Sequence, residues 1–381
     1  MVKKLYKIIV LGGTHSGWAP NSTPIQRAHF LTKVGDLFCF NVDTNIEDSL
    51  SNKVRHYRLK NWNVSFIVRI VKQWIGTDTT NRLVWCGPSW SHLAIGQKVA
   101  KRINAKLVLD LYDHLYLPND VYRARGNHFM ALVHDIKAIL GKRHLKACNL
   151  LVRAIAIDPN SCGVPENLQI EVMNGVNQDV IKRGENWFSH EWRKKEITCL
   201  YLGVLDRERT SVLEPLLKLA SKTNRAWNFE LVGPSEESYA MALREAVKGS
   251  SVSLNIYGRL EWDKAMDFVE NADCCLYPFR SSRELDCVYP IKLGEYLAFG
   301  KPCISSDLQG AREMSSGQGV LFVDFNNASQ WYKSIEILRK NPAFCRHQGK
   351  LARNRALEIT WDKVHRPLWE ALINNVNESK K

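Results

Sequence analysis

The sequence predicts an α/β protein made of two domains, each with a parallel β-sheet. At 381 residues the chain exceeds what a single hydrophobic core usually supports, so we expect two domains. Residues 7–11 (KIIVL) form a continuous apolar run that ends in a glycine pair, which is the pattern of a central parallel strand. A second series of alternating strand-like and helix-like segments begins at residues 197–205 (ITCLYLGVL), so the second half repeats the alternation of the first.

The loop after the first strand, GGTHSG, departs from the two common phosphate-binding loops. Thr14 replaces the middle glycine of a dinucleotide-binding loop, and Trp18 stands where a phosphate loop requires lysine. Two interpretations remain open. The loop is a tight turn, or its small residues let a substrate approach the backbone closely.

The first half continues with a helix near residues 24–34, a strand at 37–42 and a helix within 61–76. Large apolar residues recur at helical spacing in the last of these, beside basic side chains: Trp62, Phe66, Ile70 and Trp74. Tryptophan next to cations suits a helix lying at a lipid interface. A core helix with exposed cations explains the same pattern.

A further strand and helix lead to residues 106–116, KLVLDLYDHLY, where acidic side chains follow an apolar strand. Asp110 and Asp113 would lie at the carboxyl end of that strand, the edge at which open α/β sheets bind ligands. A carboxylate there can act as a general base that deprotonates an acceptor hydroxyl. The alternative is a loop with a helix-capping aspartate.

The positive charge of the protein is concentrated in its first half. The net charge is +14, and residues 1–185 contain 25 Lys and Arg against 14 Asp and Glu, whereas the remainder has 28 against 25. A basic helical stretch before residue 147 is one source of this excess. The asymmetry indicates an anionic partner such as nucleic acid, acidic lipid or a phosphorylated substrate, and simple solubility is the alternative.

Cysteine usage and hydropathy indicate a cytoplasmic protein. The ten cysteines are scattered without a CxxC pair, which favours reduced thiols and argues against a structural zinc site. No apolar run approaches 18 residues, so no membrane span is expected. The basic N-terminus with its short apolar run is typical of a first strand and differs from a secretion signal.

The second half predicts strands at residues 227–234, 253–260 and 272–279. The last of these leads into residues 284–306, ELDCVYPIKLGEYLAFGKPCISS, which contain a short helix that starts at Pro290 and stops at Gly300. Lys292 and Glu295 lie one turn apart on this helix. A helix start beside a lysine attracts phosphate, and a carboxylate one turn deeper can accept hydrogen bonds from both hydroxyls of a ribose. The arrangement is typical of a nucleotide site, although a solvated Lys–Glu pair explains it too.

The string P-x-K-L-x-E-Y-L-A-x-G-K-P in this stretch resembles the donor-binding helix of GT-B glycosyltransferases, particularly the family 4-like group. In this resemblance Glu295 holds the ribose of a nucleotide sugar, and the helix start at Tyr289 and Pro290 faces the diphosphate together with Lys292. Many relatives carry another glutamate eight residues before the ribose-binding one. Cys287 occupies that position here, so its contact is missing or is supplied by Glu284.

The same resemblance assigns further donor-binding residues. Relatives have an arginine at the position of Val204, and Arg209 falls at the later basic position of their motif, with Arg207 close by. Gly258 and Arg259 match the loop whose backbone commonly reads the base edge. The resemblance therefore implies four further donor-site residues in the second half: Arg207, Arg209, Gly258 and Arg259. It adds a fifth, Gly13, from the loop after the first strand.

For catalysis, LVLDLYDHL resembles the V-Y-D-x-x-D segment of some GT-B transferases, which places the catalytic base at Asp113. Tyr112 stands where some relatives have histidine, and His114 is a possible replacement for it. The resemblance is convincing over residues 196–325 and patchy over 1–180. It implies two Rossmann-like domains that face each other across a cleft.

The predicted organisation is an acceptor-binding domain at residues 1–185, a nucleotide-sugar domain at 196–355 and a C-terminal helix at 356–381 that packs back on the first domain. The predicted reaction is sugar transfer from a nucleotide diphosphate to a glycan acceptor, lipid-linked or anionic, without a metal or another cofactor. We expect a cytoplasmic protein, with peripheral binding to the inner face of an anionic membrane as an extension. A nucleotide-sugar epimerase of the same fold and a non-enzymatic nucleic-acid binder are the alternatives, although we expect no nucleic-acid partner.

Overall fold

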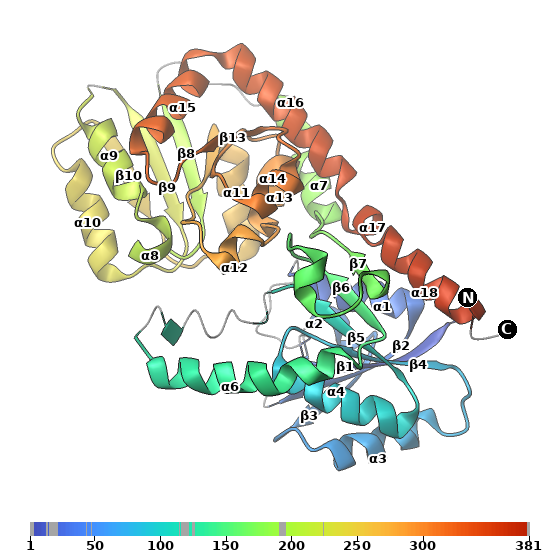
Figure 1. Ribbon diagram of the computed structural model, residues 1–381. Coiled ribbons are helices and arrows are strands. Elements are labelled where there is room, and N and C mark those ends of the chain that lie inside the picture. The colour runs from blue at the N-terminus through green and yellow to red at the C-terminus, as the bar shows by residue number, and fades with distance from the viewer. Residues whose placement is uncertain are drawn as a thin grey trace. The chain divides into compact units, whose positions relative to one another are not determined.

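The chain forms two compact units in a computed structural model (Figure 1). The N-terminal unit comprises residues 1–174 with 364–381, and the C-terminal unit comprises residues 175–363. The structure describes residues 4–12, 14, 22–42, 44–46, 48–113, 115, 122–123, 126–189, 196–223 and 225–378.

The N-terminal unit is built on a seven-stranded sheet in which every strand pair is parallel. Its strands, in spatial order, are β3 (Arg55–Leu59), β2 (Gly35–Val42), β1 (Tyr6–Leu11), β4 (Asn81–Cys86), β5 (Lys106–Leu111), β6 (Leu150–Arg153) and β7 (Gln169–Glu171). The chain winds outward from β1 to β3 and then returns to β4 on the other side of β1. The topological switch point therefore lies between β1 and β4, where ligands of such sheets bind.

Helices cover this sheet: α1 (Thr23–Val34), α2 (Asp48–Ser51), α3 (Val64–Ile75), α4 (Trp90–Ile103), α6 (His128–Leu145) and α18 (Arg366–Glu378). Side chains fix where several of them begin. Asn63 caps α3, since its Oδ1 accepts the Phe66 N–H at 3.0 Å. Each helix of the described residues is too short or too polar to cross a bilayer.

The apolar residues of α3 are used in the fold of the N-terminal unit. Ile67 and Val71 are fully buried, and Trp74 packs edge-on against Phe38 of β2 with its ring centroid 5.4 Å away. Lys7 lies over the same tryptophan ring. Of the two interpretations of this helix, the structure favours the core helix with exposed cations.

The C-terminal segment of the chain belongs to the N-terminal unit from Val364 onward. Leu368 and Leu372 of α18 are buried in the same core as β1 and β2. The hydroxyl of Tyr6 donates a hydrogen bond to the Leu372 carbonyl at 2.6 Å, which ties this helix to the first strand.

The C-terminal unit holds a six-stranded sheet whose neighbours all pair in parallel. Its spatial order is β10 (Val252–Ile256), β9 (Trp227–Val232), β8 (Ile197–Leu202), β11 (Cys274–Tyr277), β12 (Cys303–Ser306) and β13 (Val320–Val323). Its topological switch point lies between β8 and β11. Both units thus confirm the predicted parallel α/β architecture.

The helices of the C-terminal unit alternate with these strands. They are α7 (Gln178–Arg183), α8 (Arg207–Thr210), α9 (Leu213–Ser221), α10 (Glu237–Val247), α11 (Trp262–Asn271), α12 (Arg283–Asp286), α13 (Ile291–Ala298), α14 (Gln309–Ser315), α15 (Ala328–Lys340), α16 (Pro342–Glu358) and α17 (Trp361–Val364). The long helix α16 packs against α13, the helix that the sequence predicts for the donor site.

Candidate functional site

The predicted donor residues follow strands that meet at the switch point of the C-terminal sheet. Arg209 lies in the connection after β8, and Lys292 lies on the helix after β11. These two strands are direct neighbours in the sheet. Because the carboxyl ends of parallel strands open on the same edge, both connections lie at one edge of the sheet, the edge at which such folds bind ligands.

The start of α13 presents unused backbone donors at this edge. Pro290 is the N-cap residue, with φ −77° and ψ 112°, and the first backbone hydrogen bond of the helix runs from the Gly294 N–H to the Pro290 carbonyl. The N–H groups of Ile291, Lys292 and Leu293 therefore have no partner within the helix. Three free donors and the positive end of the helix dipole make this turn attractive to an anion.

The end of α13 confirms the stop signal predicted at Gly300. The Lys301 N–H donates to the Tyr296 carbonyl at 3.1 Å and the Gly300 N–H to the Leu297 carbonyl at 2.9 Å, which is the Schellman arrangement. Gly300 adopts φ 60°, a conformation that favours glycine. The length of the helix is thus set by its own sequence.

The face of α13 that carries the apolar residues is buried and is tied to β8 by a hydrogen bond. Leu293, Tyr296 and Leu297 are fully buried, and the Tyr296 hydroxyl accepts the Leu202 N–H at 3.0 Å, at the carboxyl end of β8. Glu295 lies between these positions and is only 4% exposed. A buried carboxylate needs donors, because its charge is costly to remove from water.

The Trp262 indole supplies one such donor, with its Nε1–H 2.9 Å from Oε1 of Glu295. Trp262 is the first residue of α11, directly after the connection that contains Gly258 and Arg259. The contact therefore brings this connection next to the glutamate. Gly258 has φ 66° and its carbonyl accepts the Gly233 N–H at 2.7 Å, while Arg259 is exposed.

Replacing Trp262 with phenylalanine tests this contact. The variant keeps the ring but removes the N–H that orients Glu295, so we expect nucleoside diphosphates to bind about tenfold more weakly, as for the loss of ~1–2 kcal/mol. Isothermal titration calorimetry measures the change. A Trp262→Phe protein with wild-type affinity contradicts a role for the contact in ligand binding.

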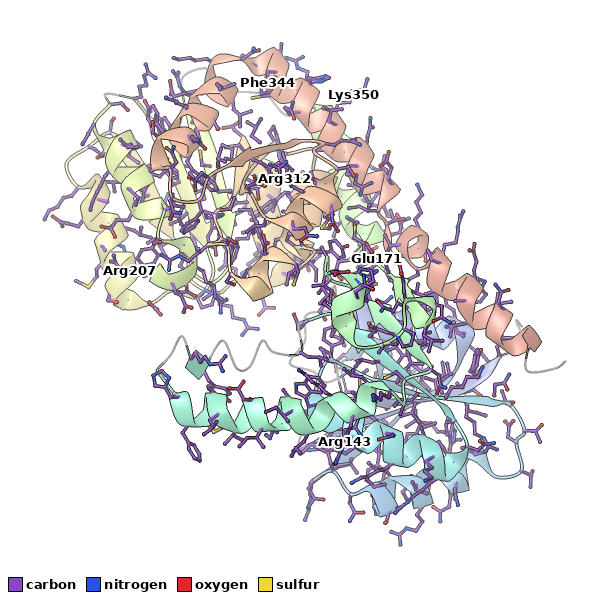
Figure 2. All side chains as sticks on the ribbon, viewed as in Figure 1. Arg143, Glu171, Arg207, Arg312, Phe344 and Lys350 are labelled. Carbon is purple, nitrogen blue, oxygen red and sulfur yellow. The ribbon has the colours of Figure 1, made fainter. Side chains whose placement is uncertain are left out.

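The two candidate arginines after β8 differ in their surroundings. Asp206 caps α8 by accepting the Arg209 N–H at 2.7 Å, and its carboxylate lies 3.4 Å from the Arg209 guanidinium. Arg207 instead pairs with Glu214 at 2.9 Å and has a mostly exposed side chain (Figure 2). Arg209 also lies close enough to Tyr277, at the end of β11, to act on its pKa. Arg209 is therefore the better placed of the two for the switch point.

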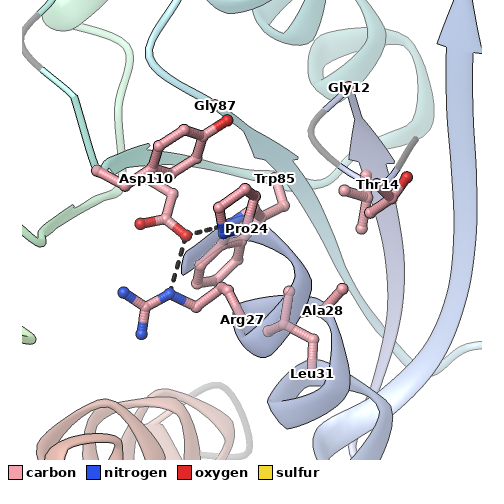
Figure 3. A pocket seen from close by; sticks show the side chains of 11 residues that line it. Gly12, Thr14, Pro24, Arg27, Ala28, Leu31, Trp85, Gly87 and Asp110 are labelled. Atoms are coloured by element: carbon pink, nitrogen blue, oxygen red, sulfur yellow. Dashed lines mark hydrogen bonds and ion pairs between the residues drawn. The ribbon is translucent and has the colours of Figure 1, made fainter. Parts of the chain in front are cut away.

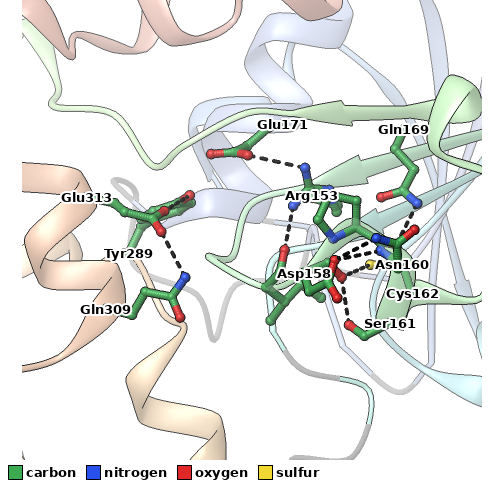
Figure 4. Close-up of polar contacts among 12 residues, drawn as sticks. Arg153, Asp158, Asn160, Ser161, Cys162, Gln169, Glu171, Tyr289, Gln309 and Glu313 are labelled. Atoms are coloured by element: carbon green, nitrogen blue, oxygen red, sulfur yellow. Dashed lines mark hydrogen bonds and ion pairs between the residues drawn. The ribbon is translucent and has the colours of Figure 1, made fainter.

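Tyr289 can offer only its backbone to a ligand. Its side chain is fully buried, and its hydroxyl donates a hydrogen bond to Oε2 of Glu313 at 2.8 Å, while Gln309 donates to the other oxygen (Figure 4). Cys287, at the position where relatives carry a glutamate, is likewise buried. The side chain of Glu284, the possible substitute, lies outside the described part of the structure.

Lys292 and Lys301 share the motif but have different environments. Lys292 is half-buried, and among the described residues its ammonium group forms no ion pair. Lys301 is 2% exposed and donates to the Glu270 carbonyl at 2.8 Å, and burial lowers its pKa to about 8. Lys292 is thus available to an anionic ligand, whereas Lys301 is part of the packing between α13 and α11.

The N-terminal unit has its own candidate site at the switch point between β1 and β4. A small pocket lies where β1, β4 and β5 end, and its lining includes Gly12, Arg27, Asp110 and Tyr112 (Figure 3). Gly12 has φ 76°, and a Cβ atom there would lie 2.7 Å from the His92 ring. Gly13 and His114 lie outside the described residues.

A buried ion pair, which sequence reasoning missed, forms one wall of this pocket. Arg27 Nε and Trp85 Nε1 both donate to Oδ2 of Asp110, at 2.9 and 3.0 Å. Within the described ranges, Nη1 and Nη2 of Arg27 and Oδ1 of Asp110 have no hydrogen-bond partner, although both residues are 1% exposed. Such atoms favour a bound polar group, because leaving them unpaired costs free energy.

Asp113 stands just beyond this pair, and its side chain is half-buried. Burial raises the pKa of its carboxyl group from 3.8 to about 6. That value suits a general base, which must be deprotonated near neutral pH and still accept a proton readily. Oδ2 of Asp110 is held by Arg27 and Trp85, so of the two predicted carboxylates Asp113 is the better placed to accept a proton.

In the described part of the chain, no group of three or more His, Cys, Asp or Glu side chains could hold a metal ion.

Comparisons with known proteins give a family model that matches part of the chain and solved structures that share its fold. Residues 196–341 match the family model described as glycosyl transferases group 1. Sucrose-phosphate synthase from Thermosynechococcus elongatus is 14% identical with a TM-score of 0.70, and the match covers 98% of this chain and 100% of that one. HepE from Anabaena, solved in complex with UDP and glucose, is 12% identical with a TM-score of 0.68, over 97% and 99% of the two chains.

A third structure, the lipopolysaccharide outer core galactosyltransferase WaaB in its apo form, is 17% identical with a TM-score of 0.62, over 98% and 100% of the chains. At such identities the likeness concerns the fold. It confirms the predicted GT-B fold class. A search of curated protein sequences gives no significant match.

Proposed function

We propose that this chain, which has the GT-B fold, is a glycosyltransferase that moves a sugar from a nucleoside-diphosphate donor to a glycan acceptor. The donor is held by the C-terminal unit and the acceptor by the N-terminal unit. The observation that carries the proposal is the position of Glu295. It is buried one turn below the free N–H groups of α13 and is oriented by Trp262.

In the proposed donor complex, the diphosphate lies against the backbone N–H groups at the start of α13, and Glu295 accepts hydrogen bonds from both ribose hydroxyls. Lys292 and Arg209 contribute positive charge, and the exposed backbone at Gly258 and Arg259 meets the base. The complexes of HepE with UDP make UDP the first nucleotide to test.

The proposed reaction breaks the bond between the anomeric carbon and the diphosphate oxygen and forms a bond to an acceptor oxygen. The acceptor hydroxyl loses its proton to the Asp113 carboxylate, and the diphosphate leaves with the electron pair. Lys292, Arg209 and the α13 N–H groups stabilise its growing negative charge, which can lower the barrier by several kcal/mol, about 3–4 for one donor in a closed site. We propose that no metal takes part, and activity unaffected by EDTA is the expected result.

The proposed acceptor is lipid-linked or anionic and belongs to glycan or polysaccharide assembly. The support is the excess of 25 cations over 14 acids in residues 1–185 and the unsatisfied guanidinium of Arg27 at the switch point, which can bind a carboxylate or phosphate. One structural neighbour is named for work on lipopolysaccharide. The ten free, buried cysteines suit a cytoplasmic location.

Thermal unfolding with a panel of UDP, GDP, ADP and CMP tests the donor assignment. We expect one diphosphate to raise Tm by a few degrees, since a ligand at about 100 Kd stabilises by ~2.7 kcal/mol. In Lys292→Ala most of the shift should disappear, and Lys264→Ala, an exposed lysine on α11, is the matched control.

If none of the nucleotides changes the Tm of the protein, the donor assignment is overturned. Product analysis with the nucleotide sugar alone separates the reaction classes, because an epimerase converts the donor without an acceptor, whereas a transferase needs one.

A further inference from the structure

Helix α6 carries an exposed apolar stripe that the fold leaves uncovered. Eleven large hydrophobic residues are exposed in the described part of the protein, and five of them lie on this one helix. Their exposed fractions range from 49 to 73%: Phe129, Leu132, Ile136, Ile139 and Leu140. Residues at this spacing project from one side of a helix, so they form a continuous strip instead of scattered contacts.

The opposite side of α6 supplies the packing against its own unit. Ala131, Ala138 and Leu145 are buried there, and a Cβ atom at Gly141 would lie 2.3 Å from the Trp90 ring of α4. With 3.6 residues per turn, these small residues lie on the face directly opposite the exposed strip. The strip therefore plays no part in holding α6 on the N-terminal unit.

Basic side chains border the apolar strip. At 3.6 residues per turn, Lys137 falls on one flank of the strip and Lys142 and Lys146 fall on the other. Arg143 continues the strip toward the helix end (Figure 2). All four are exposed. The one acidic residue of α6, Asp135, is paired with Arg123. An apolar stripe with cations along both edges matches the interior and the anionic surface of a bilayer leaflet.

We propose that α6 docks the protein on an anionic membrane, lying in the plane of the interface with its apolar strip inserted. Charge complementarity selects this occupant over a second copy of the chain, because an isologous contact would bring the basic flanks of two α6 helices together. The assignment also differs from the sequence-based one, since the apolar residues of α3 are used in its own unit. Sugar transfer is not a premise of this proposal.

Vesicle flotation with the full-length chain tests the proposal. We expect the protein to float with phosphatidylcholine vesicles that contain about one third phosphatidylglycerol and to stay behind with pure phosphatidylcholine. Binding should weaken as salt rises. Phe129→Gln and Ile139→Gln, which replace exposed side chains with a good helix former, should each reduce the bound fraction at least severalfold, and the double variant should lose binding.

Met241→Gln on α10 is the matched control, since Met241 is an equally exposed apolar residue of the C-terminal unit. It should float like the wild type. A triple Lys137→Gln, Lys142→Gln, Lys146→Gln variant should lose its preference for anionic vesicles. Each variant should have the circular dichroism spectrum and the nucleotide-dependent Tm shift of the wild type. A loss of membrane binding can then be distinguished from unfolding and from a defect in the donor site.

Two results overturn the proposal. The first is equal binding of wild type and the Phe129→Gln, Ile139→Gln double variant to anionic vesicles. The second is a wild-type protein that forms dimers in solution, does not float with anionic vesicles, and becomes monomeric in the double variant. That outcome would assign the strip to a second copy of the chain.

Discussion

Glu295→Ala is expected to lower kcat/KM by about 100- to 1,000-fold and to abolish the Tm shift produced by the diphosphate. A carboxylate that accepts two hydrogen bonds from a ribose contributes ~3–4 kcal/mol to binding. A loss of this free energy corresponds to the 100- to 1,000-fold decrease in kcat/KM. The loss should be large because Glu295 is 4% exposed, so water does not replace the missing acceptor efficiently. Steady-state kinetics and thermal unfolding measure both effects.

A donor analogue with 2′-deoxyribose provides the internal control. The wild type should prefer the ribose form strongly, and Glu295→Ala should not distinguish the two, because the residue that reads the hydroxyl is gone. Glu295→Gln keeps an oxygen acceptor for the Trp262 N–H and should retain more activity than alanine. Retention of both the ribose preference and the Tm shift in Glu295→Ala would refute the donor assignment.

Asp113→Asn is expected to lower kcat by about 100- to 10,000-fold, the range that general base catalysis contributes. Asparagine has nearly the same shape but cannot take a proton from the acceptor hydroxyl at neutral pH. The proposed donor site lies in the other unit, so the diphosphate-dependent Tm shift should survive. Loss of donor binding in this variant, or wild-type turnover, would contradict the role of Asp113 as the base.

The pH dependence follows from the raised pKa of Asp113. Its carboxyl has a pKa of about 6 in the folded protein against 3.8 for the ordinary group, and burial is the cause. Activity should therefore rise as the pH passes through about 6, where the base loses its proton. The stability of the folded protein changes in the opposite direction, because the charged Asp113 carboxylate is costly to bury. This cost is absent below pH 3.8, grows between pH 3.8 and about 6, and is fully present above pH 6.

Asp113→Asn should consequently unfold at a higher temperature than the wild type at pH 8, while being far less active. Gain of stability with loss of activity is typical of a residue kept for chemistry. Asp110→Asn is the contrast, because it weakens the buried ion pair with Arg27 and should unfold at a lower temperature. Scanning calorimetry at pH 4 and pH 8 separates the two aspartates.

Helix α13, which we propose to hold the donor, shows how far local sequence reasoning extends. Pro290, Gly300 and the spacing of Leu293, Tyr296 and Leu297 predicted its start, its end and its buried face, and the structure confirms all three. Those features depend on groups within about two turns of one another, so the order of residues along the chain contains them. Central strands such as β1 and β8 were predictable for a similar reason, since each is a largely apolar run, whereas the polar edge strands β3 (RHYRL) and β7 (QIE) carry no such signal.

Contacts between distant segments were outside the reach of such reasoning. Trp262 meets Glu295 across 33 positions and Arg27 meets Asp110 across 83, and no local pattern marks either partner. The interpretation of α3 illustrates the same limit, because its large apolar residues fit both a membrane and a core until Phe38 is seen packed on Trp74.

The sequence by itself determined the parallel α/β class, the central strands and the start and end of α13, because short-range sterics, capping and periodicity decide these features. Only the tertiary structure decided which polar groups meet in the two candidate sites, which carboxylate is free to act as a base, and which helix exposes its apolar side. These properties depend on burial, and burial is set by segments far apart in the chain.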